Sequence, residues 1–296
     1  MRCCLCGSSQ VTYLIHHLDF SGVDIYWCEE CQYGFASPET DPELLASYYR
    51  DTYSMQRQHY LNASSYYVLM QHRAHAQINF LKQTVPAIPL QAQQWQVLDW
   101  GCGIGALVTA FCNEGMQAIG YDYDPSVIKC GRSLWNANIH LAPRHFDDLV
   151  QQHHLLCLSH VIEHLDHLQA SVLTILTWLH DEGYVFIEVP AYSKSMFQGN
   201  VATESHLHFF TRRSLIRFLE RLPLRVITCL NCGPPVQKVG KRSLLSRVVR
   251  KFQTLWQAAN KKDEISTMYD GFYETYYPES DERGIWLRCL AQKTNS

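Results

Sequence analysis

The chain has 296 residues, of which 47% are hydrophobic and 18% are charged, and its formal net charge is −3. These values predict one large globular domain with a small appendage, exclude a disordered chain, and argue against binding of nucleic acid through bulk charge. No apolar run reaches the ~18 residues of a membrane span and no export signal is recognisable, so we expect a cytoplasmic protein whose cysteines bind metal rather than form disulfides.

Two C-x-x-C pairs form the first motif: Cys3 with Cys6, and Cys28 with Cys31. The segments between the pairs alternate in the way that short strands do. Four thiolates on two tight turns close a tetrahedral shell around zinc and leave no open position, which is typical of a structural site. We therefore predict a zinc ribbon over residues 1–36, with the neighbouring Cys4 as a bystander.

Residues 37–85 are predicted to be helical, and they are rich in tyrosine. Aromatic side chains three or four residues apart favour packing against a core, and the alternative is that they roof an active site. A turn-rich connector, residues 86–95, leads into the main domain. The tyrosines are Tyr48, Tyr49, Tyr53, Tyr60, Tyr66 and Tyr67.

The stretch VLDWGCGIGALV predicts a strand that ends at Trp100, a turn over 101–105 and a following helix. This is the first unit of a doubly wound sheet, in which ligands bind at the carboxyl ends of the strands. Glycines in such a turn let a ligand approach the backbone closely. The acid Asp99 would repel a pyrophosphate, but it suits a ligand with an ammonium group, such as S-adenosylmethionine.

The second strand ends near Asp122, about twenty residues after the glycine turn, where an acid can accept hydrogen bonds from ribose hydroxyls. Asp124 is interpreted as the cap of the next helix, since Pro125 follows it. After a short third strand come Asp147 and Asp148, one of which is expected to meet the adenine amino group, with Asp147 as the candidate.

Five motifs in this order resemble class I S-adenosylmethionine-dependent methyltransferases, and the closest match is a bacterial group with an N-terminal zinc ribbon. The resemblance covers residues 1 to 230, and the motifs are DWGCGIG, YDYDPS, LLCLSHVIEHLDH, YVFIEVP and ESHLHFFTRRSL. It implies a doubly wound α/β fold with a seven-stranded sheet whose last strand is antiparallel. The domain would comprise residues 86–230 and 284–296, and four apolar runs of buried-strand length agree with it.

The resemblance also implies a cofactor site. Asp99 and the turn glycines would hold the methionine part, Asp122 the ribose, and the turn at Ser159 and His160 the sulfonium side. The turn glycines are Gly101, Gly103 and Gly105. A sulfonium is already a strong methyl donor, so the protein's task is in-line positioning and removal of a proton from the acceptor.

The segment His160–His164 supplies candidates for that base. On a helix that begins at residue 160, the side chains of His160, Glu163 and His164 share one face. His206 and His208 could approach from the loop after the fifth strand.

Three interpretations of this histidine segment stay open. In the first, Glu163 and His164 cap and pack the helix, and His160 alone faces the cofactor. In the second, His160 or His164 is the general base and Glu163 orients it. In the third, the group binds a metal ion, as related E-x-x-E-H segments do in quinone-precursor and small-RNA methyltransferases. His160 stands where those segments have a glutamate, which favours a transition metal over Mg²⁺.

We expect residues 231–283 to form an insertion after the sixth strand that contains a basic amphipathic helix. The helix packs on the domain in one interpretation; in the others it contacts an anionic membrane surface or closes over a phosphate-bearing substrate.

The predicted function is methyl transfer to a small or medium hydroxylated acceptor. The ribbon-bearing relatives suggest a sugar or sugar nucleotide of surface-glycan biosynthesis, with S-adenosylmethionine as cofactor and a structural Zn²⁺ ion. One alternative is methylation of RNA gripped by the ribbon, which the low charge disfavours. Others are a quinone-precursor-type O-methyltransferase and a binding module that keeps the fold only as a scaffold; the intact cofactor motif argues against the module.

Overall fold

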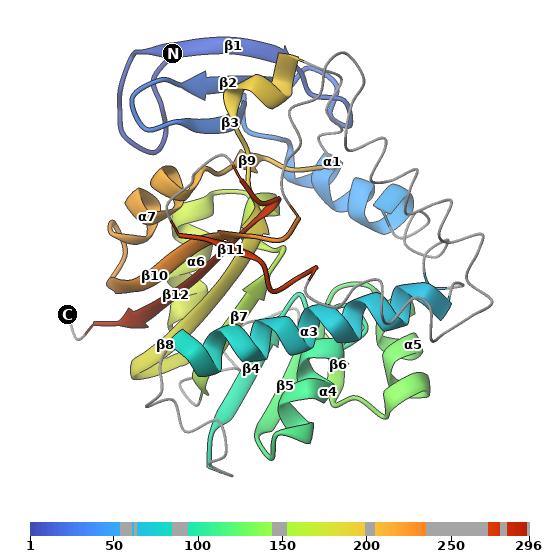
Figure 1. Cartoon of the computed structure of the whole chain (residues 1–296). Coiled ribbons are helices and arrows are strands. Elements are labelled where there is room, and N and C mark those ends of the chain that lie inside the picture. The colour runs from blue at the N-terminus through green and yellow to red at the C-terminus, as the bar shows by residue number, and fades with distance from the viewer. Residues whose placement is uncertain are drawn as a thin grey trace.

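A computed structural model describes residues 1–53, 61, 64–84, 94–143, 153–198, 205–234, 272–278 and 283–294. A large mixed sheet with helices on both faces lies beneath a small N-terminal sheet (Figure 1). Asp147 lies outside the described residues, as does most of the predicted insertion with its basic helix. Within the described chain, no helix combines the length and the apolar character that crossing a membrane requires.

The large sheet has eight described strands in the order β11-β10-β12-β8-β7-β4-β5-β6. Their bounds are β4 (Gln96–Trp100), β5 (Gln117–Asp122), β6 (Ile139–Leu141), β7 (His153–Ser159), β8 (Leu179–Pro190), β10 (Leu224–Cys232), β11 (Tyr276–Tyr277) and β12 (Trp286–Lys293). The strands β6, β5, β4, β7 and β8 are parallel to one another. β12 is antiparallel to both β8 and β10, as predicted for the last strand.

The predicted count of seven strands differs from the structure by the short strand β11. Tyr276 and Tyr277 pair with Cys232 and Asn231, and so cover the end of the edge strand β10. Two residues carry no strand periodicity, so the sequence held no signal for this pairing.

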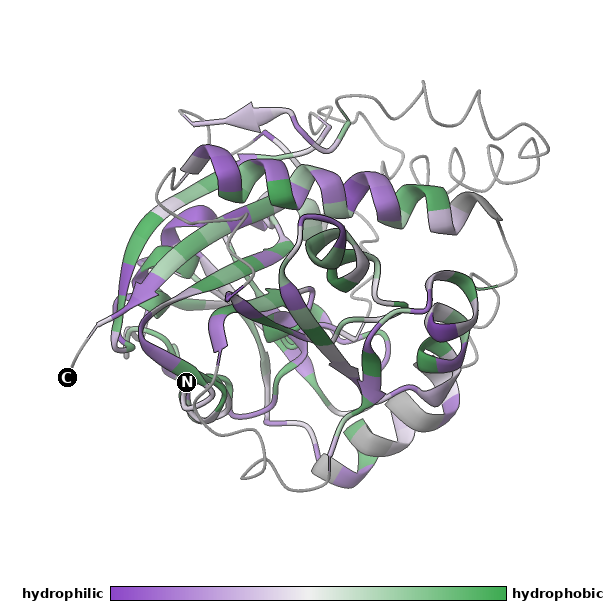
Figure 2. Cartoon of the chain, turned by 90° about the horizontal axis from the view of Figure 1, so that it is seen from below, coloured by the Kyte–Doolittle hydropathy of each residue, from purple (hydrophilic) through white to green (hydrophobic). Residues whose placement is uncertain are grey.

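The described helices are α1 (Pro42–Ser47), α3 (Ser64–Thr84), α4 (Ala106–Asn113), α5 (Pro125–Trp135), α6 (Leu168–Leu176) and α7 (Arg212–Leu219). Shorter helical turns are Tyr48–Tyr53, Ile162–His164 and Lys194–Gln198. Two core clusters cover the two faces of the sheet, one with α3, α4 and α5 and the other with α6 and α7. Figure 2 shows hydrophobic residues along the strands between these helices.

The N-terminal module, residues 1–37, forms a sheet together with a strand of the main domain. Its strands are β1 (Val11–His16), β2 (Asp24–Cys28) and β3 (Tyr33–Ser37), and β9 (His208–Phe209) from the main domain completes their sheet. A Cβ at Gly34 would lie 2.8 Å from Phe209 Cβ, so only glycine allows β3 and β9 this close approach. Module and main domain therefore share one sheet.

Gly131 of α5 packs directly on the turn that follows β4. A Cβ at this position would lie 2.1 Å from the Ile104 carbonyl oxygen. We expect Gly131→Ala to lower the free energy of unfolding by about 1–3 kcal/mol, since overpacking outweighs the ~1 kcal/mol that alanine contributes in a helix. Urea unfolding measures the change, with Ser133→Ala on the exposed face of α5 as the control. Equal or greater stability of Gly131→Ala would contradict this packing argument.

Candidate functional site

The turn after β4 has the backbone conformation that its glycines suggest. Gly101, Gly103 and Gly105 have φ angles of 73°, 54° and 78°, in the left-handed region that favours glycine. A Cβ at Gly101 would lie 2.6 Å from Val161 Cγ2, so the turn is also pressed against the chain that follows β7. The N–H groups of Gly101 and Cys102 donate to the Tyr121 carbonyl oxygen, so the turn is fixed at the carboxyl edge of the sheet.

Asp99 lies on β4 directly below this turn and is 3% exposed. Among the described residues, no group hydrogen-bonds to its buried Oδ1 atom. Burial raises the pKa of this carboxyl to about 8, and repulsion from Asp122 adds to the effect, while Arg73 partly offsets it. A buried acid with an unpartnered oxygen suits a ligand that brings its own cation.

Asp122 ends β5 and faces the same turn. Its Oδ2 atom accepts a hydrogen bond from Gly103 N at 2.8 Å, and Oδ1 accepts one from Asp124 N at 2.9 Å. A carboxylate oxygen has two lone pairs, so a single hydrogen bond does not exhaust its capacity as an acceptor. Asp124 caps α5 by accepting from Ser126 N, as predicted. Tyr123, which the sequence analysis did not single out, lies between the two acids with 62% exposure.

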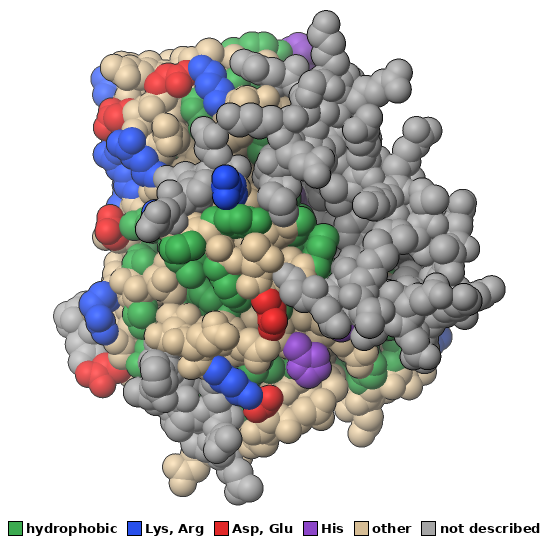
Figure 3. All heavy atoms as spheres, in the orientation of Figure 1, with side chains coloured by type: hydrophobic (Ala, Val, Ile, Leu, Met, Phe, Trp, Pro, Cys, Tyr) green, Lys and Arg blue, Asp and Glu red, His purple; other side chains and the backbone are tan. Residues whose placement is uncertain are grey.

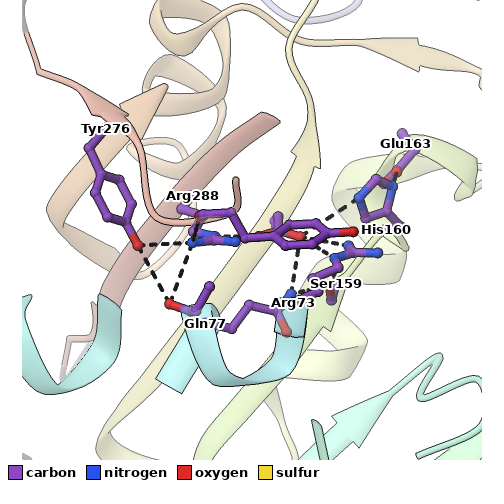
Figure 4. Close-up of polar contacts among 10 residues, drawn as sticks. Arg73, Gln77, Ser159, His160, Glu163, Tyr276 and Arg288 are labelled. Atoms are coloured by element: carbon purple, nitrogen blue, oxygen red, sulfur yellow. Dashed lines mark hydrogen bonds and ion pairs between the residues drawn. The ribbon is translucent and has the colours of Figure 1, made fainter. Parts of the chain in front are cut away.

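Ser159 ends β7 beside a buried charged cluster centred on Glu188. Figure 4 shows Ser159 together with Arg73, Gln77 and Arg288 of this cluster. Arg73 and Gln77 reach this cluster from α3, and Arg288 reaches it from β12. Arg73 Nε lies 2.6 Å from Glu188 Oε1, Arg73 Nη2 donates to Ser159 Oγ at 3.0 Å, and Arg288 Nε also donates to Glu188. Burial alone would raise the pKa of Glu188, but the two guanidinium groups outweigh it and hold that pKa below its ordinary value.

Sequence reasoning missed this cluster. Its signal was a charged residue inside each of two apolar strand sequences, Glu188 in YVFIEVP and Arg288 in WLRCLAQ. Both side chains have no exposed surface, which is rare for charged residues unless they are paired.

His160 follows β7 and faces two acids. Its Nδ1 atom lies 3.2 Å from Glu163 Oε1, and its Nε2 atom lies 3.8 Å from Glu188 Oε1. No described group hydrogen-bonds to Nε2. Burial lowers the pKa of His160 well below its usual value, and Arg73 lowers it further. The ring is therefore neutral near neutral pH.

The prediction of a helix that begins at residue 160 is wrong. His160 has a left-handed backbone, with φ of 57°, which cannot begin a right-handed helix, and only the 3₁₀ turn Ile162–His164 follows. As a result His160 pairs with Glu163, whereas the His164 ring lies against the His206 ring with centroids 4.5 Å apart.

A second group forms around that ring pair. One ligand atom from each of Glu163, His164 and His206 lies within 4.8 Å of the others. Tyr192 Oη lies 2.6 Å from His206 Nδ1. His206 was named in the sequence analysis only as a residue that could approach.

His208, a candidate from the sequence, contacts the N-terminal module and the chain that follows the turn Ile162–His164. It lies on β9, with Nδ1 2.5 Å from Tyr33 Oη and Nε2 2.8 Å from the Leu165 carbonyl oxygen. Burial lowers the pKa of His208 to about 4. Both ring nitrogens therefore serve the junction between the module and the main domain.

The four predicted metal cysteines come together in the N-terminal module. Ligand sulfurs of Cys3, Cys6, Cys28 and Cys31 lie within 4.8 Å of one another. The Cys3–Cys31 and Cys6–Cys28 sulfurs are 3.6 and 3.5 Å apart. A tetrahedral zinc site with Zn–S bonds of about 2.3 Å places sulfurs about 3.8 Å apart, whereas a disulfide needs about 2.05 Å. The donor set therefore fits zinc.

The comparisons place the chain among known proteins. A family model described as a methyltransferase domain matches residues 47–228. No curated protein matches the sequence significantly.

Solved structures share the fold at low identity. The 1,6-didemethyltoxoflavin N1-methyltransferase of Burkholderia thailandensis, with bound 1,6-didemethyltoxoflavin and S-adenosylhomocysteine, aligns at TM-score 0.51 and 13% identity over 95% of this chain and 99% of that one. A putative sarcosine dimethylglycine methyltransferase of Galdieria sulphuraria aligns at TM-score 0.51 and 14% identity, over 75% of this chain and 85% of that one. A putative methyltransferase of Bacillus halodurans aligns at TM-score 0.50 and 14% identity, over 73% of this chain and 100% of that one.

The environment of Asp99 predicts a pH-dependent stability. The pKa of about 8 in the folded chain exceeds the unfolded value of about 3.9. Between these values the folded state holds a proton that the unfolded state has lost. The free energy of unfolding therefore falls as pH rises, by at most about 1.4 kcal/mol per pH unit for this group.

Asp99→Asn is expected to remove this dependence, because the amide mimics the neutral carboxyl and does not titrate. Urea unfolding of both proteins in steps between about pH 5 and pH 8 measures it. The exposed Asp181→Asn is the control. A constant difference between wild type and Asp99→Asn across this range would contradict the raised pKa.

Proposed function

The chain belongs to the methyltransferase domain family, and from this premise we propose that it transfers the methyl group of S-adenosylmethionine to a small or medium hydroxylated acceptor. We propose a sugar or a sugar nucleotide as the acceptor class. The observation that carries the cofactor assignment is the buried Asp99 oxygen without a described hydrogen-bond partner, at the edge of three left-handed glycines.

The methionine end of the cofactor is a zwitterion, and the site offers both charges that it needs. Asp99 would pair with the ammonium group. Arg73 lies near enough to lower the pKa of Asp99, and its contacts with Glu188 and Ser159 fix the guanidinium in place. We assign Arg73 to the carboxylate group of the cofactor. The ribose would bind Asp122, and the exposed Tyr123 ring offers a face for adenine. Asp147 stays a prediction for the adenine amino group.

The proposed base is His160. Its Nδ1 atom faces the Glu163 carboxylate, which orients the ring and leaves the Nε2 lone pair for a proton. The lowered pKa of His160 keeps the ring neutral before the reaction. As the acceptor oxygen attacks the methyl group, its proton passes to Nε2, and Glu163 stabilises the imidazolium that forms. S-adenosylmethionine, when bound, supplies the activated methyl group.

A second candidate, metal-assisted deprotonation, is favoured by the grouping of Glu163, His164 and His206. Two imidazoles and one carboxylate suit a divalent transition ion better than Mg²⁺. Such an ion, when bound, would acidify an acceptor hydroxyl, as in the quinone-precursor alternative. If it acts, His164→Ala abolishes turnover and added Mn²⁺ raises the wild-type rate; under the His160 proposal neither occurs.

In the described residues, no observation favours the RNA alternative. Figure 3 shows basic and acidic side chains interspersed over the described part of one face. The overall charge of −3 gives no excess to hold a phosphate backbone.

Cofactor binding tests the proposal directly. We expect Asp99→Ala to weaken binding of S-adenosylmethionine by about 10- to 100-fold, because a charge-assisted hydrogen bond is lost. Near neutral pH, binding to wild type should also release a proton, since the ammonium group ionises a carboxyl whose pKa is about 8. Calorimetry in buffers of different ionisation heats measures both quantities. Unchanged affinity, or binding to wild type without proton release, would count against this site.

For the cysteine cluster we propose a structural zinc ion. Purified wild type should contain close to one zinc ion per chain, and Cys28→Ser should lose it and unfold at a lower temperature, because metal binding contributes to folding. Cys4→Ser is the matched control, since Cys4 lies outside the cluster. Elemental analysis and thermal unfolding provide the readouts. Zinc-free wild type would refute the assignment.

A further inference from the structure

The segment Ser205–Leu207 carries His206, and the N-terminal module binds its backbone. His17 Nε2 lies 3.0 Å from the His206 carbonyl oxygen, and Ser205 N donates to Asp19 Oδ2 at 2.9 Å. In the next residue, Leu207, the carbonyl oxygen accepts from Ala36 N of the module at 2.9 Å, and the N–H donates to the Glu163 carbonyl oxygen at 2.8 Å. The segment thus lies between the module and the proposed catalytic turn.

On the module side of this contact, local hydrogen bonds hold the His17 ring in place. His17 is 5% exposed, and its Nδ1 atom accepts from the backbone N–H groups of Asp19 and Phe20 at 3.1 and 3.3 Å. This arrangement assigns the proton to Nε2, which then donates to the His206 carbonyl. Phe20 and Leu207 belong to one apolar cluster, which holds the two segments together.

The backbone at Ser205 is strained, since its φ is 60° and it is not a glycine. Such a conformation persists where surrounding contacts over-determine it. The contact from Ser205 N to Asp19 is one of them. Its consequence is the placement of the His206 ring against His164 and Tyr192.

We propose that the N-terminal module is a positioning element of the methyl-transfer site, in which His17 and Asp19 hold the strained Ser205–His206 backbone and so set the His206 imidazole beside Glu163 and His164. This inference rests on the proposed function for its effect on rate, but not for its effect on structure. The module would serve catalysis through the chain itself and not by gripping a substrate.

The test uses the full chain with ¹⁵N-labelled histidine, and three variants. Asp19→Ala removes the acceptor, Asp19→Asn keeps an oxygen for Ser205 N, and Asp24→Ala changes an acid of the same module that contacts His16 and Tyr26 instead. We expect Asp19→Ala alone to shift or broaden the His206 imidazole signals. Its rate of methyl transfer from tritiated S-adenosylmethionine to the small-molecule fraction of a cell extract should fall about tenfold, with cofactor affinity unchanged. His206 lies beside Glu163, which orients the proposed base His160, and misplacement within such a group lowers the rate of the chemical step.

The outcomes separate the two levels of inference. His206 signals of Asp19→Ala that match wild type would overturn the positioning role, and so would equal rate losses in Asp19→Ala and Asp24→Ala. Failure of Asp19→Asn to restore rate and spectrum would likewise overturn the hydrogen-bond argument. A wild-type chain that does not bind S-adenosylmethionine would refute the proposed function, while the spectra would still decide whether Asp19 positions His206.

Discussion

The buried carboxylate of Glu188 connects the parts of the molecule on which the site depends. It lies on β8 and meets Arg73 and Gln77 from α3 and Arg288 from β12. Its backbone carbonyl also accepts the His160 N–H at 2.7 Å. Burying three charges costs solvation free energy, and mutual pairing offsets it as long as all partners are present. The cluster therefore fixes α3 over the sheet and the end of β7 beneath the proposed cofactor.

Asp99 on β4, which β7 separates from β8, has a different electrostatic environment. Asp99 is as buried as Glu188, yet no described cation pairs with it directly, and its pKa rises instead of falling. Two buried acids on strands that flank β7 thus have opposite environments. Glu188 is paired with two guanidinium groups within the fold, whereas in the proposed function the cation that pairs with Asp99 comes from the ligand. Such local cost without a structural gain is typical of functional sites.

The N-terminal module is packed into the main domain and is not a separate appendage. As a sequence it resembles a separate zinc-binding appendage, but its β3 pairs with β9 and its core joins the main core. The same junction absorbs His208, whose two ring nitrogens contact Tyr33 and Leu165. The cysteine cluster, the shared sheet and the segment that carries His206 form one continuous structure. Folding of the module and geometry of the site are therefore coupled.

The sequence by itself determined the features that local pattern encodes. The strand Gln96–Trp100, the glycine turn, the cap at Asp124 and the cysteine pairs follow from short-range spacing and hydrophobic periodicity. The antiparallel direction of the last strand follows from the resemblance to class I methyltransferases. The tertiary structure alone decided the placement of His160, His206 and His208, and the cluster of Arg73, Glu188 and Arg288. The reason is physical: one left-handed residue redirects the chain after β7, and contacts between residues a hundred or more positions apart carry no signal within either segment.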